Sequence, residues 1–266
     1  MIKMVALDLD HTLLTSTKTI SKVNELELKK LHEQGIKVVL CTGRPINAIW
    51  KFIEQLELLQ ADDYTITFNG GLVIRNHDHH ELAKTGMPKQ QFRAIYDYAK
   101  QNDFPLDILD FQQVYPITDL KPSIYRQMLA AKMDFVPTEF ADLPDESFSK
   151  GIMAAEKNVL DEAVAKMPAE VAQQYHIVRS QDQILEFLPV NSDKAAGLEQ
   201  LLKQFGWDFS NLMAFGDAEN DAGMLKSAKI GVAMGNATPA IKAIANEETV
   251  TNDEDGVAVF LKKYFD

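Results

Sequence analysis

The sequence predicts an α/β fold in which a parallel-sheet core is interrupted by an inserted α+β domain. Helical and strand-like segments alternate at both ends of the chain, and polar clusters follow directly after buried strand-like runs. The middle of the chain loses that alternation. We therefore expect a core formed by residues 1–82 and 190–266, with an inserted domain at residues 83–189.

Composition is typical of an ordinary globular protein. The chain has 266 residues, 46% of them hydrophobic, which suffices for one large or two modest domains. A formal net charge of −12, without a basic run, argues against nucleic-acid binding. No apolar stretch reaches the roughly 20 residues of a membrane span and no signal-peptide core is seen, so we expect no membrane partner. The single cysteine, Cys41, excludes an internal disulfide and suits the cytoplasm.

The first buried strand begins near Met4 and runs into Asp8 and Asp10. Side chains alternate along an extended chain, so both carboxylates should point the same way, with room for one phosphorus atom between them. We interpret Asp8 as a nucleophile and Asp10 as a proton-transfer group. The same residues could instead form a simple turn, because Asp and Thr side chains bind loop backbone.

Helices and strands then alternate through the first part of the chain. Ser21 is a typical helix N-cap and Gly35 a typical terminator, while Pro45 suits the first turn of a second helix. The expected elements are a helix at 21–33, a strand at 36–41, a helix from 45 to about 58, a strand at 64–68, the turn Asn69-Gly70-Gly71 and a hairpin strand at 72–74.

The loop at residues 76–80 contains three of the six histidines. Imidazoles bind transition metals well, so a metal site is conceivable. No second cluster of ligands is evident in the sequence, and we expect a solvated hairpin tip.

The inserted region mixes helices and strands. We expect helices from 88, at 121–132 and at 160–174, and strands within 106–117 and at 151–155, 176–179 and 184–190. Aromatic and methionine side chains such as Phe92 and Met153 should form its core, although some could line a substrate pocket. The alternation then resumes with helices at 192–205, from 238 and at 256–264, and strands at 212–215 and 230–234.

Four groups of polar residues fall at predicted strand ends or helix starts. Right-handed crossovers between parallel strands place the ligand crevice at the carboxyl ends of those strands. The groups that converge there are Asp8 with Asp10, Thr42 with Gly43, Lys194, and Asp217 with Asn220 and Asp221.

These motifs resemble those of haloacid dehalogenase superfamily phosphatases, and the whole chain resembles the Cof-type, YidA-like branch of sugar phosphatases. The resemblance implies a Rossmann-like core and a cap, inserted after the second motif, that closes over the site. His11 and Ala195 stand where that family commonly has glycine, so His11 replaces a conformationally permissive residue. The motifs are Asp8-Leu9-Asp10-His11-Thr12, Thr42-Gly43-Arg44, Lys194 and Gly216-Asp217-Ala218-Glu219-Asn220-Asp221.

Crowded carboxylates require a cation. Two like charges about 4 Å apart cost roughly 4 kcal/mol at an effective dielectric of 20. Mg²⁺ prefers oxygen ligands and would polarise phosphoryl oxygens. We expect Asp8 and Asp217 to bind it through their side chains, and the resemblance adds the backbone carbonyl of Asp10.

The expected reaction has two steps. Asp8 attacks phosphorus in line and forms an aspartyl-phosphate, while Asp10 protonates the leaving alcohol and then deprotonates water. The phosphoryl oxygens would be held by the amides of Leu9 and Gly43 and the side chains of Thr42, Lys194 and Asn220. Asp221 is expected to orient Lys194 or a metal-bound water, with Thr12 and Arg44 in support.

Two of these residues have ordinary alternatives. A lysine at the start of a helix is usually solvated, but the position of Lys194 among the other motifs favours a functional role. Cys41, beside Thr42, could be considered a nucleophile, but a buried strand favours an inert core residue.

We interpret the chain as a Mg²⁺-dependent phosphatase of small phosphorylated metabolites, in the first place sugar phosphates. A phosphotransferase of phosphomannomutase type uses the same paired aspartates and stays open. A signalling domain that accepts phosphate on aspartate also stays open, as does a sugar-phosphate binding protein without catalytic activity. Neither the individual metabolite nor the oligomeric state follows from the sequence.

Overall fold

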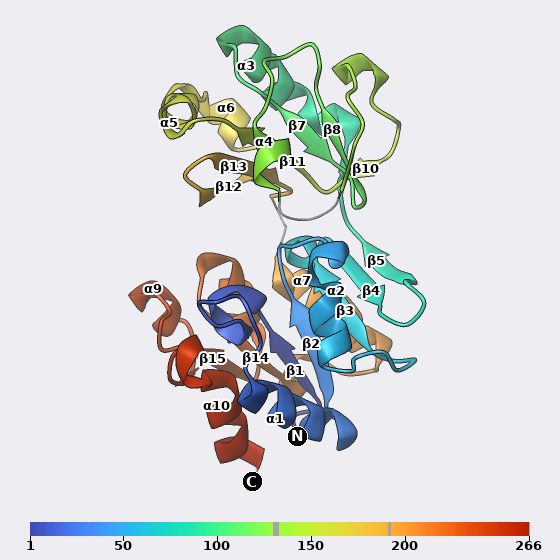
Figure 1. Cartoon of the computed structure of the whole chain (residues 1–266), viewed down its shortest axis with the longest axis vertical. Coiled ribbons are helices and arrows are strands. Elements are labelled where there is room, and N and C mark those ends of the chain that lie inside the picture. The colour runs from blue at the N-terminus through green and yellow to red at the C-terminus, as the bar shows by residue number, and fades with distance from the viewer. Residues whose placement is uncertain (130–132, 191–192, 266) are drawn as a thin grey trace. The chain divides into compact units, whose positions relative to one another are not determined.

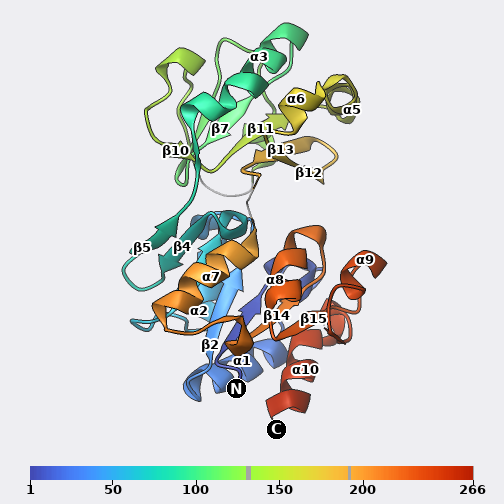
Figure 2. The same cartoon turned by 180° about the vertical axis from the view of Figure 1, so that it is seen from behind.

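The chain divides into two compact units in the computed structural model, which describes residues 1–129, 133–190 and 193–265. The first unit joins Met1–Lys84 to Asp193–Asp266, and the second is Thr85–Ser192 (Figures 1 and 2). The boundaries expected from the sequence, 82/83 and 189/190, lie slightly earlier. Among the described residues, no helix has the length and apolar character to cross a bilayer.

The first unit is built on an eight-stranded sheet of order β16-β15-β14-β1-β2-β3-β4-β5. Neighbours from β16 to β3 are parallel, and β4 and β5 add an antiparallel hairpin. This confirms the predicted α/β class. The strands are β1 (Met4–Leu7), β2 (Lys37–Cys41), β3 (Tyr64–Thr67), β4 (Leu72–Arg75), β5 (Glu81–Lys84), β14 (Leu212–Gly216), β15 (Ile230–Ala233) and β16 (Glu247–Glu248).

Helices cover both faces of this sheet. α7 and α8 lie on one face, where Leu198 and Met224 share a buried cluster with Met4 of β1. α1 and α10 lie on the other, joined by a hydrogen bond from the Ala258 amide to the Asn24 side chain. The helices are α1 (Lys22–Glu33), α2 (Ile46–Gln55), α7 (Lys194–Gln204), α8 (Ala222–Ser227), α9 (Pro239–Lys242) and α10 (Gly256–Phe265).

Predicted helix ends are confirmed where a side chain or a glycine defines them. The Ser21 hydroxyl accepts a hydrogen bond from the Asn24 amide at 3.1 Å, and Gly35 ends that segment with φ of 87°. Thr238 caps α9, which begins with proline. The prediction for Pro45 is wrong by one position, because it is the N-cap of α2 rather than part of its first turn.

The second unit has a six-stranded sheet of order β12-β13-β11-β7-β8-β9 and a small sheet of β10 and β6. α3, α5 and α6 share one buried cluster with its strands, and α4 shares another with Leu109 and Ile152. The elements are β6 (Met87–Pro88), α3 (Arg93–Asn102), β7 (Asp107–Leu109), β8 (Gln113–Pro116), α4 (Tyr125–Met128), β9 (Asp134–Phe135), β10 (Ser147–Phe148), β11 (Lys150–Ala154), α5 (Lys157–Lys166), α6 (Ala169–Ala172), β12 (His176–Gln181) and β13 (Ile184–Leu188).

Two predicted helices of this region are shorter in the structure. The helix expected at 160–174 is divided into α5 and α6, because Pro168 forces Met167 out of helical geometry (φ −66°, ψ 122°). The helix expected at 121–132 is reduced to α4, with Leu129 already extended, and residues 130–132 lie outside the described residues. Ser192, the expected start of the next helix, also lies outside them.

Candidate active site

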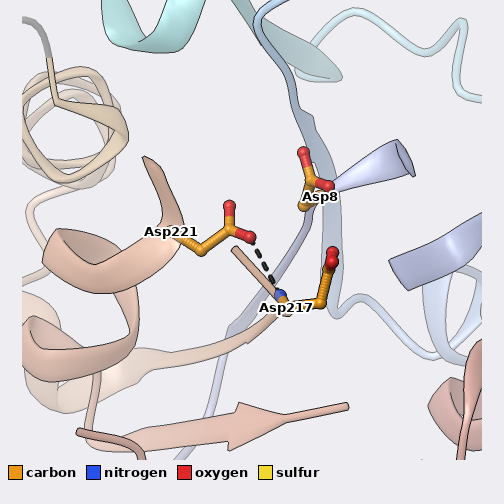
Figure 3. Close-up of side chains that lie close together, drawn as sticks. All are labelled: Asp8, Asp217 and Asp221. Carbon is orange, nitrogen blue, oxygen red and sulfur yellow. Dashed lines mark hydrogen bonds between the residues drawn. The ribbon is translucent and has the colours of Figure 1, made fainter. Parts of the chain in front are cut away.

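The central strands of the eight-stranded sheet end in polar residues. β1 pairs in parallel with β14 and β2, so that Leu7 is level with Phe215 and Leu40. Asp8, Thr42 and Asp217 follow these strands and therefore reach the same sheet edge, as the strand-end rule predicts. Figure 3 shows the carboxylates of Asp8, Asp217 and Asp221 close together.

Lys194 lies among these carboxylates. Its side chain is 0% exposed, with Nζ 2.5 Å from Asp8 Oδ1 and 2.6 Å from Asp221 Oδ1. Burial alone lowers the pKa of an ammonium, but the Asp221 and Asp8 carboxylates raise the pKa of Lys194 overall. Lys194 is thus a fixed positive charge within the site and not a solvated lysine at a helix start.

Close backbone packing holds the start of α7. The carboxylate of Asp193 caps the helix by accepting the Ala195 amide at 2.9 Å. A Cβ on Gly70 would lie 2.2 Å from the Asp193 carbonyl oxygen, and one on Gly223 would lie 2.1 Å from the Asp193 carboxylate. The Gly70 position therefore requires glycine, whereas a side chain at Gly223 would displace the Asp193 carboxylate, and this packing holds the backbone from which Lys194 extends.

Both carboxylate oxygens of Asp221 accept hydrogen bonds within the protein. Oδ1 pairs with Lys194, and Oδ2 accepts the amides of Asp217 at 2.9 Å and Ala218 at 3.0 Å (Figure 3). A Cβ on Gly216 would lie 2.5 Å from the Asp221 Cβ, so only glycine permits this approach. Asp221 therefore holds the Asp217 loop and Lys194 in one arrangement.

Asp8 is a buried carboxyl with a perturbed pKa. It is 5% exposed, and burial, which Lys194 offsets only in part, raises its pKa to about 8 with help from Asp221 and Asp217. Lys194 donates to Oδ1, whereas Oδ2 has no donor among the described residues. One oxygen of Asp8 is therefore available to bind a ligand.

Asp217 lies beside Asp8 and is supported by Thr12. The Thr12 hydroxyl donates to Asp217 Oδ1 at 2.9 Å. Burial raises the pKa of Asp217 to about 6, since the Asp221 charge adds to burial and the Thr12 hydrogen bond opposes it. Among the described residues, Thr12 donates to Asp217 Oδ1 and no donor to Oδ2 is found.

The carboxylates of this site fit a divalent cation. Asp8, Asp217 and Asp221 each offer an oxygen, and these oxygens lie within 4.8 Å of one another. When ionised, these three carboxylates face one ammonium, which leaves two uncompensated negative charges (3 − 1). Oxygen ligands of this kind suit Mg²⁺. This group of three carboxylates contains Asp221 and does not contain the Asp10 carboxylate.

Asp10 is bound to basic side chains. Arg44 Nε donates to Oδ2 at 2.8 Å and Nη2 to Oδ1 at 2.6 Å, and Lys18 Nζ donates to Oδ1 at 2.9 Å. Burial alone raises the pKa of Asp10, but these hydrogen bonds hold it below its ordinary value. Asp8 and Asp10 therefore have different partners. Both residues have extended backbone, with ψ of 159° and 124°, and the chain turns only after them, at His11, whose φ is 61°.

The remaining predicted phosphate-binding residues surround Asn69. The Thr42 carbonyl accepts the Asn69 amide at 3.0 Å, and the Asn220 side chain donates to Asn69 Oδ1 at 3.3 Å. A Cβ on Gly43 would lie 3.0 Å from the Asn69 carboxamide. Leu9 is buried beside Asp8 along the chain.

Sequence reasoning missed Asn69 and Lys18. Asn69 follows β3 at the same sheet edge as Thr42, so the strand-end rule could have found it, but Asn69-Gly70 is also a common turn sequence. Lys18 reaches Asp10 from a turn eight residues further along, where the sequence has no signal.

The alternatives weighed for Cys41 and the histidine loop have ordinary explanations. Cys41 is buried, and burial raises the pKa of its thiol, as in an inert core residue. His77, His79 and His80 are exposed, and no metal-binding group found among the described residues includes them. The His79 ring stacks on Trp50 with centroids 4.8 Å apart.

Comparison with known proteins identifies the family of this chain. Residues 5–261 match the family model described as haloacid dehalogenase-like hydrolase. Phosphatase YwpJ of Bacillus subtilis is 32% identical over 295 residues, covering 98% of this chain and 99% of the relative. The 5-amino-6-(5-phospho-D-ribitylamino)uracil phosphatase YitU of the same organism is 30% identical over 284 residues, covering 98% and 97%. A crystal structure of a haloacid dehalogenase-like hydrolase from Bacteroides thetaiotaomicron is 30% identical, covers both chains completely and has a TM-score of 0.85. The chain therefore belongs to the haloacid dehalogenase-like hydrolases, as its motifs predict.

Proposed function

We propose that this enzyme is a Mg²⁺-dependent phosphatase that hydrolyses small phosphorylated metabolites through an aspartyl-phosphate. The observation that carries the proposal is the position of Asp8, a buried carboxylate at the end of the central strand with one free oxygen, beside Lys194 and Asp217. A nucleophile for phosphorus needs such an oxygen close to positive charge that can stabilise the transition state.

In the first step, an oxygen of Asp8 forms a bond to phosphorus while the bond from phosphorus to the ester oxygen breaks. Asp10 gives its proton to the departing alcohol. In the second step Asp10 removes a proton from water, which attacks phosphorus and releases phosphate and the Asp8 carboxylate. Lys194, Thr42, Asn220 and the amides of Leu9 and Gly43 hold the phosphoryl oxygens in both steps.

The contacts of Asp10 place a condition on these two reaction steps. The hydrogen bonds from Arg44 and Lys18 favour the ionised form of Asp10, which is the form that acts as a base. Proton donation in the first step therefore requires Asp10 to leave Arg44. Arg44 is then free to meet an anionic substrate, in the supporting role expected from the sequence.

We assign the metal to Asp8, Asp217 and the main-chain oxygen of Asp10. When bound, Mg²⁺ supplies charge neutralisation and polarises the phosphoryl oxygens. Asp221 belongs to the carboxylate group but already accepts three hydrogen bonds, so we assign it to orienting Lys194 and the Asp217 loop.

Sugar phosphates are the substrate class that we propose, with the second unit as the substrate-selecting cap. The resemblance to Cof-type enzymes supports this choice, and so does the substrate for which YitU is named, a phosphorylated ribityl compound. The buried, unpaired Cys41 agrees with a cytoplasmic setting for such an enzyme.

The test is a screen of phosphate release from phosphorylated metabolites with Mg²⁺, comparing wild type with Asp8→Asn. We expect Asp8→Asn to lose at least about 10³-fold in kcat, because the amide is not a nucleophile. Glu199→Gln, which changes an exposed carboxylate paired with Lys203, is the matched control and should keep wild-type rates. Wild-type turnover by Asp8→Asn would refute the nucleophile, and transfer of phosphate to a second sugar in place of release would identify a phosphotransferase.

A further inference from the structure

The turn after β3 has an unusual backbone. Phe68, Asn69 and Gly70 have φ of 52°, 53° and 95°, so three successive residues occupy the left-handed region. This conformation costs a residue with a side chain roughly 1–2 kcal/mol, and surrounding contacts must hold it in place. The contacts of the turn at residues 68–70 must therefore offset this cost.

Asn69 contacts two of the proposed phosphate-binding segments. Its amide donates to the Thr42 carbonyl at 3.0 Å, and its carboxamide fills the space where a Cβ on Gly43 would lie, at 3.0 Å. On the opposite side, Asn69 Oδ1 accepts a hydrogen bond from Asn220 Nδ2 at 3.3 Å. Asn69 thus joins the segment after β2 to the segment after β14.

Gly70 contacts a third segment. The approach of Gly70 to the Asp193 carbonyl oxygen leaves no room for a Cβ, and a Cβ on Gly197 of α7 would lie 3.0 Å from the Gly70 Cα. The turn therefore packs closely against the backbone that carries Lys194. Asn69 cannot move without disturbing these neighbours, so its carboxamide is held in a defined place.

We propose that Asn69 is a positioning residue that orients the Asn220 carboxamide toward the phosphoryl group. This inference rests on the proposed function. The Asn220 nitrogen carries two hydrogens, and Asn69 Oδ1 accepts one of them. That hydrogen bond fixes which end of the Asn220 amide is the donor and leaves the second hydrogen to meet a phosphoryl oxygen beside the Gly43 amide.

The test measures the affinity of the Mg²⁺-loaded full-length protein for inorganic phosphate by calorimetry, together with kcat and KM for the best ester. Asn69→Gly removes the carboxamide while glycine keeps the left-handed backbone accessible. We expect Kd for phosphate and KM to rise about tenfold and kcat to change less than about twofold, as for an interaction equally present in the ground and transition states. Asn69→Gly combined with Asn220→Ala should bind phosphate no more weakly than Asn220→Ala alone.

Asp255→Gly is the matched control. Asp255 also has a left-handed backbone, with φ of 58°, in a segment outside the site, so its variant should bind phosphate like wild type. Unchanged phosphate affinity in Asn69→Gly, or additive losses in the double variant, would overturn the proposal. A loss of affinity together with a Tm well below that of Asp255→Gly would also overturn it, in favour of a purely structural role. Phosphate binding needs no turnover, so a wild type that binds phosphate but hydrolyses no ester would refute the proposed function and leave the role of Asn69 testable.

Discussion

At the scale of single residues, His11 occupies a backbone conformation that glycine adopts at lower cost. Its φ is 61°, and its carbonyl accepts a hydrogen bond from Asn236 at 2.8 Å. The histidine keeps the left-handed conformation, and the surrounding contacts must overcome the steric cost of its Cβ.

His11→Gly should stabilise the protein by about 0.5–1 kcal/mol. Relief of the left-handed strain exceeds the entropy that glycine adds to the unfolded chain. Urea unfolding followed by tryptophan fluorescence measures the change. His80→Gly, at an exposed loop position without positive φ, should not stabilise, and a destabilised His11→Gly would contradict the strain argument.

Arg44→Ala should raise the pKa of Asp10. The two Arg44 hydrogen bonds lower that pKa, whereas burial acts in the opposite direction and remains after the substitution. Carboxyl NMR titration of the metal-free protein would measure it. Lys18→Ala should produce a smaller rise, because Lys18 makes a single bond to Asp10, and an unchanged pKa in Arg44→Ala would show that the bidentate contact is not formed in solution.

At the scale of secondary-structure elements, β7 carries a carboxyl group that burial holds in its neutral form. Asp107 is 1% exposed, and its Oδ2 has no hydrogen-bond partner among the described residues. Burial, opposed by a hydrogen bond with Ser123, raises its pKa to about 7 from 3.8. The folded second unit therefore retains this proton over a range in which the unfolded chain has lost it.

The sign of the pH effect follows from the raised pKa. Between about pH 4 and pH 7 the folded state binds more protons at Asp107, so this residue lowers the free energy of unfolding as pH rises. Asp107→Asn should therefore match wild type near pH 4 and be more stable by roughly 2–4 kcal/mol above pH 7. Hydrogen exchange of the β7 and β11 amides would measure this difference in the free energy of unfolding, with Asp134→Asn as an exposed control. A gain that is independent of pH would contradict the assignment.

The elements also show what the sequence could predict. Asp8, Thr42 and Asp217 were predictable because parallel strands end at one edge, and Lys194 because it begins a helix that starts at that edge. The partners of Asp10 were not, since Arg44 reaches it from the segment after β2 and Lys18 from a later turn, and strand order dictates neither contact. Short pieces such as β9 and β16 were missed, because two residues carry no periodic pattern.

At the scale of the whole molecule, part of the excess negative charge lies where the proposed metal would bind. The chain has a formal net charge of −12, and its described carboxylate group faces only one buried ammonium. A cation that binds only the folded state stabilises it by mass action, by about 2.7 kcal/mol at a hundredfold excess over Kd.

Mg²⁺ should therefore raise the Tm of the first unit, which contains both Trp50 and Trp207 as fluorescent reporters. Asp217→Asn should lose most of this increase, because it removes a charged ligand. Asp10→Asn should keep it, because the proposed ligand there is the main-chain oxygen. An equal loss in both variants would mean that the Asp10 carboxylate binds the metal directly.

The strand order determines when the site can assemble during synthesis. β1 lies between β2 and β14, and the Thr12 to Asp217 hydrogen bond spans 205 residues. During synthesis the N-terminal segment leaves the ribosome first, yet Asp8, the proposed nucleophile, gains Lys194 and Asp217 as neighbours only when the segment after the second unit emerges. The intervening segment, 85–192, is continuous and has its own core, so it can fold while the first strand still waits for β14. The proposed site can therefore assemble only after β14 has emerged.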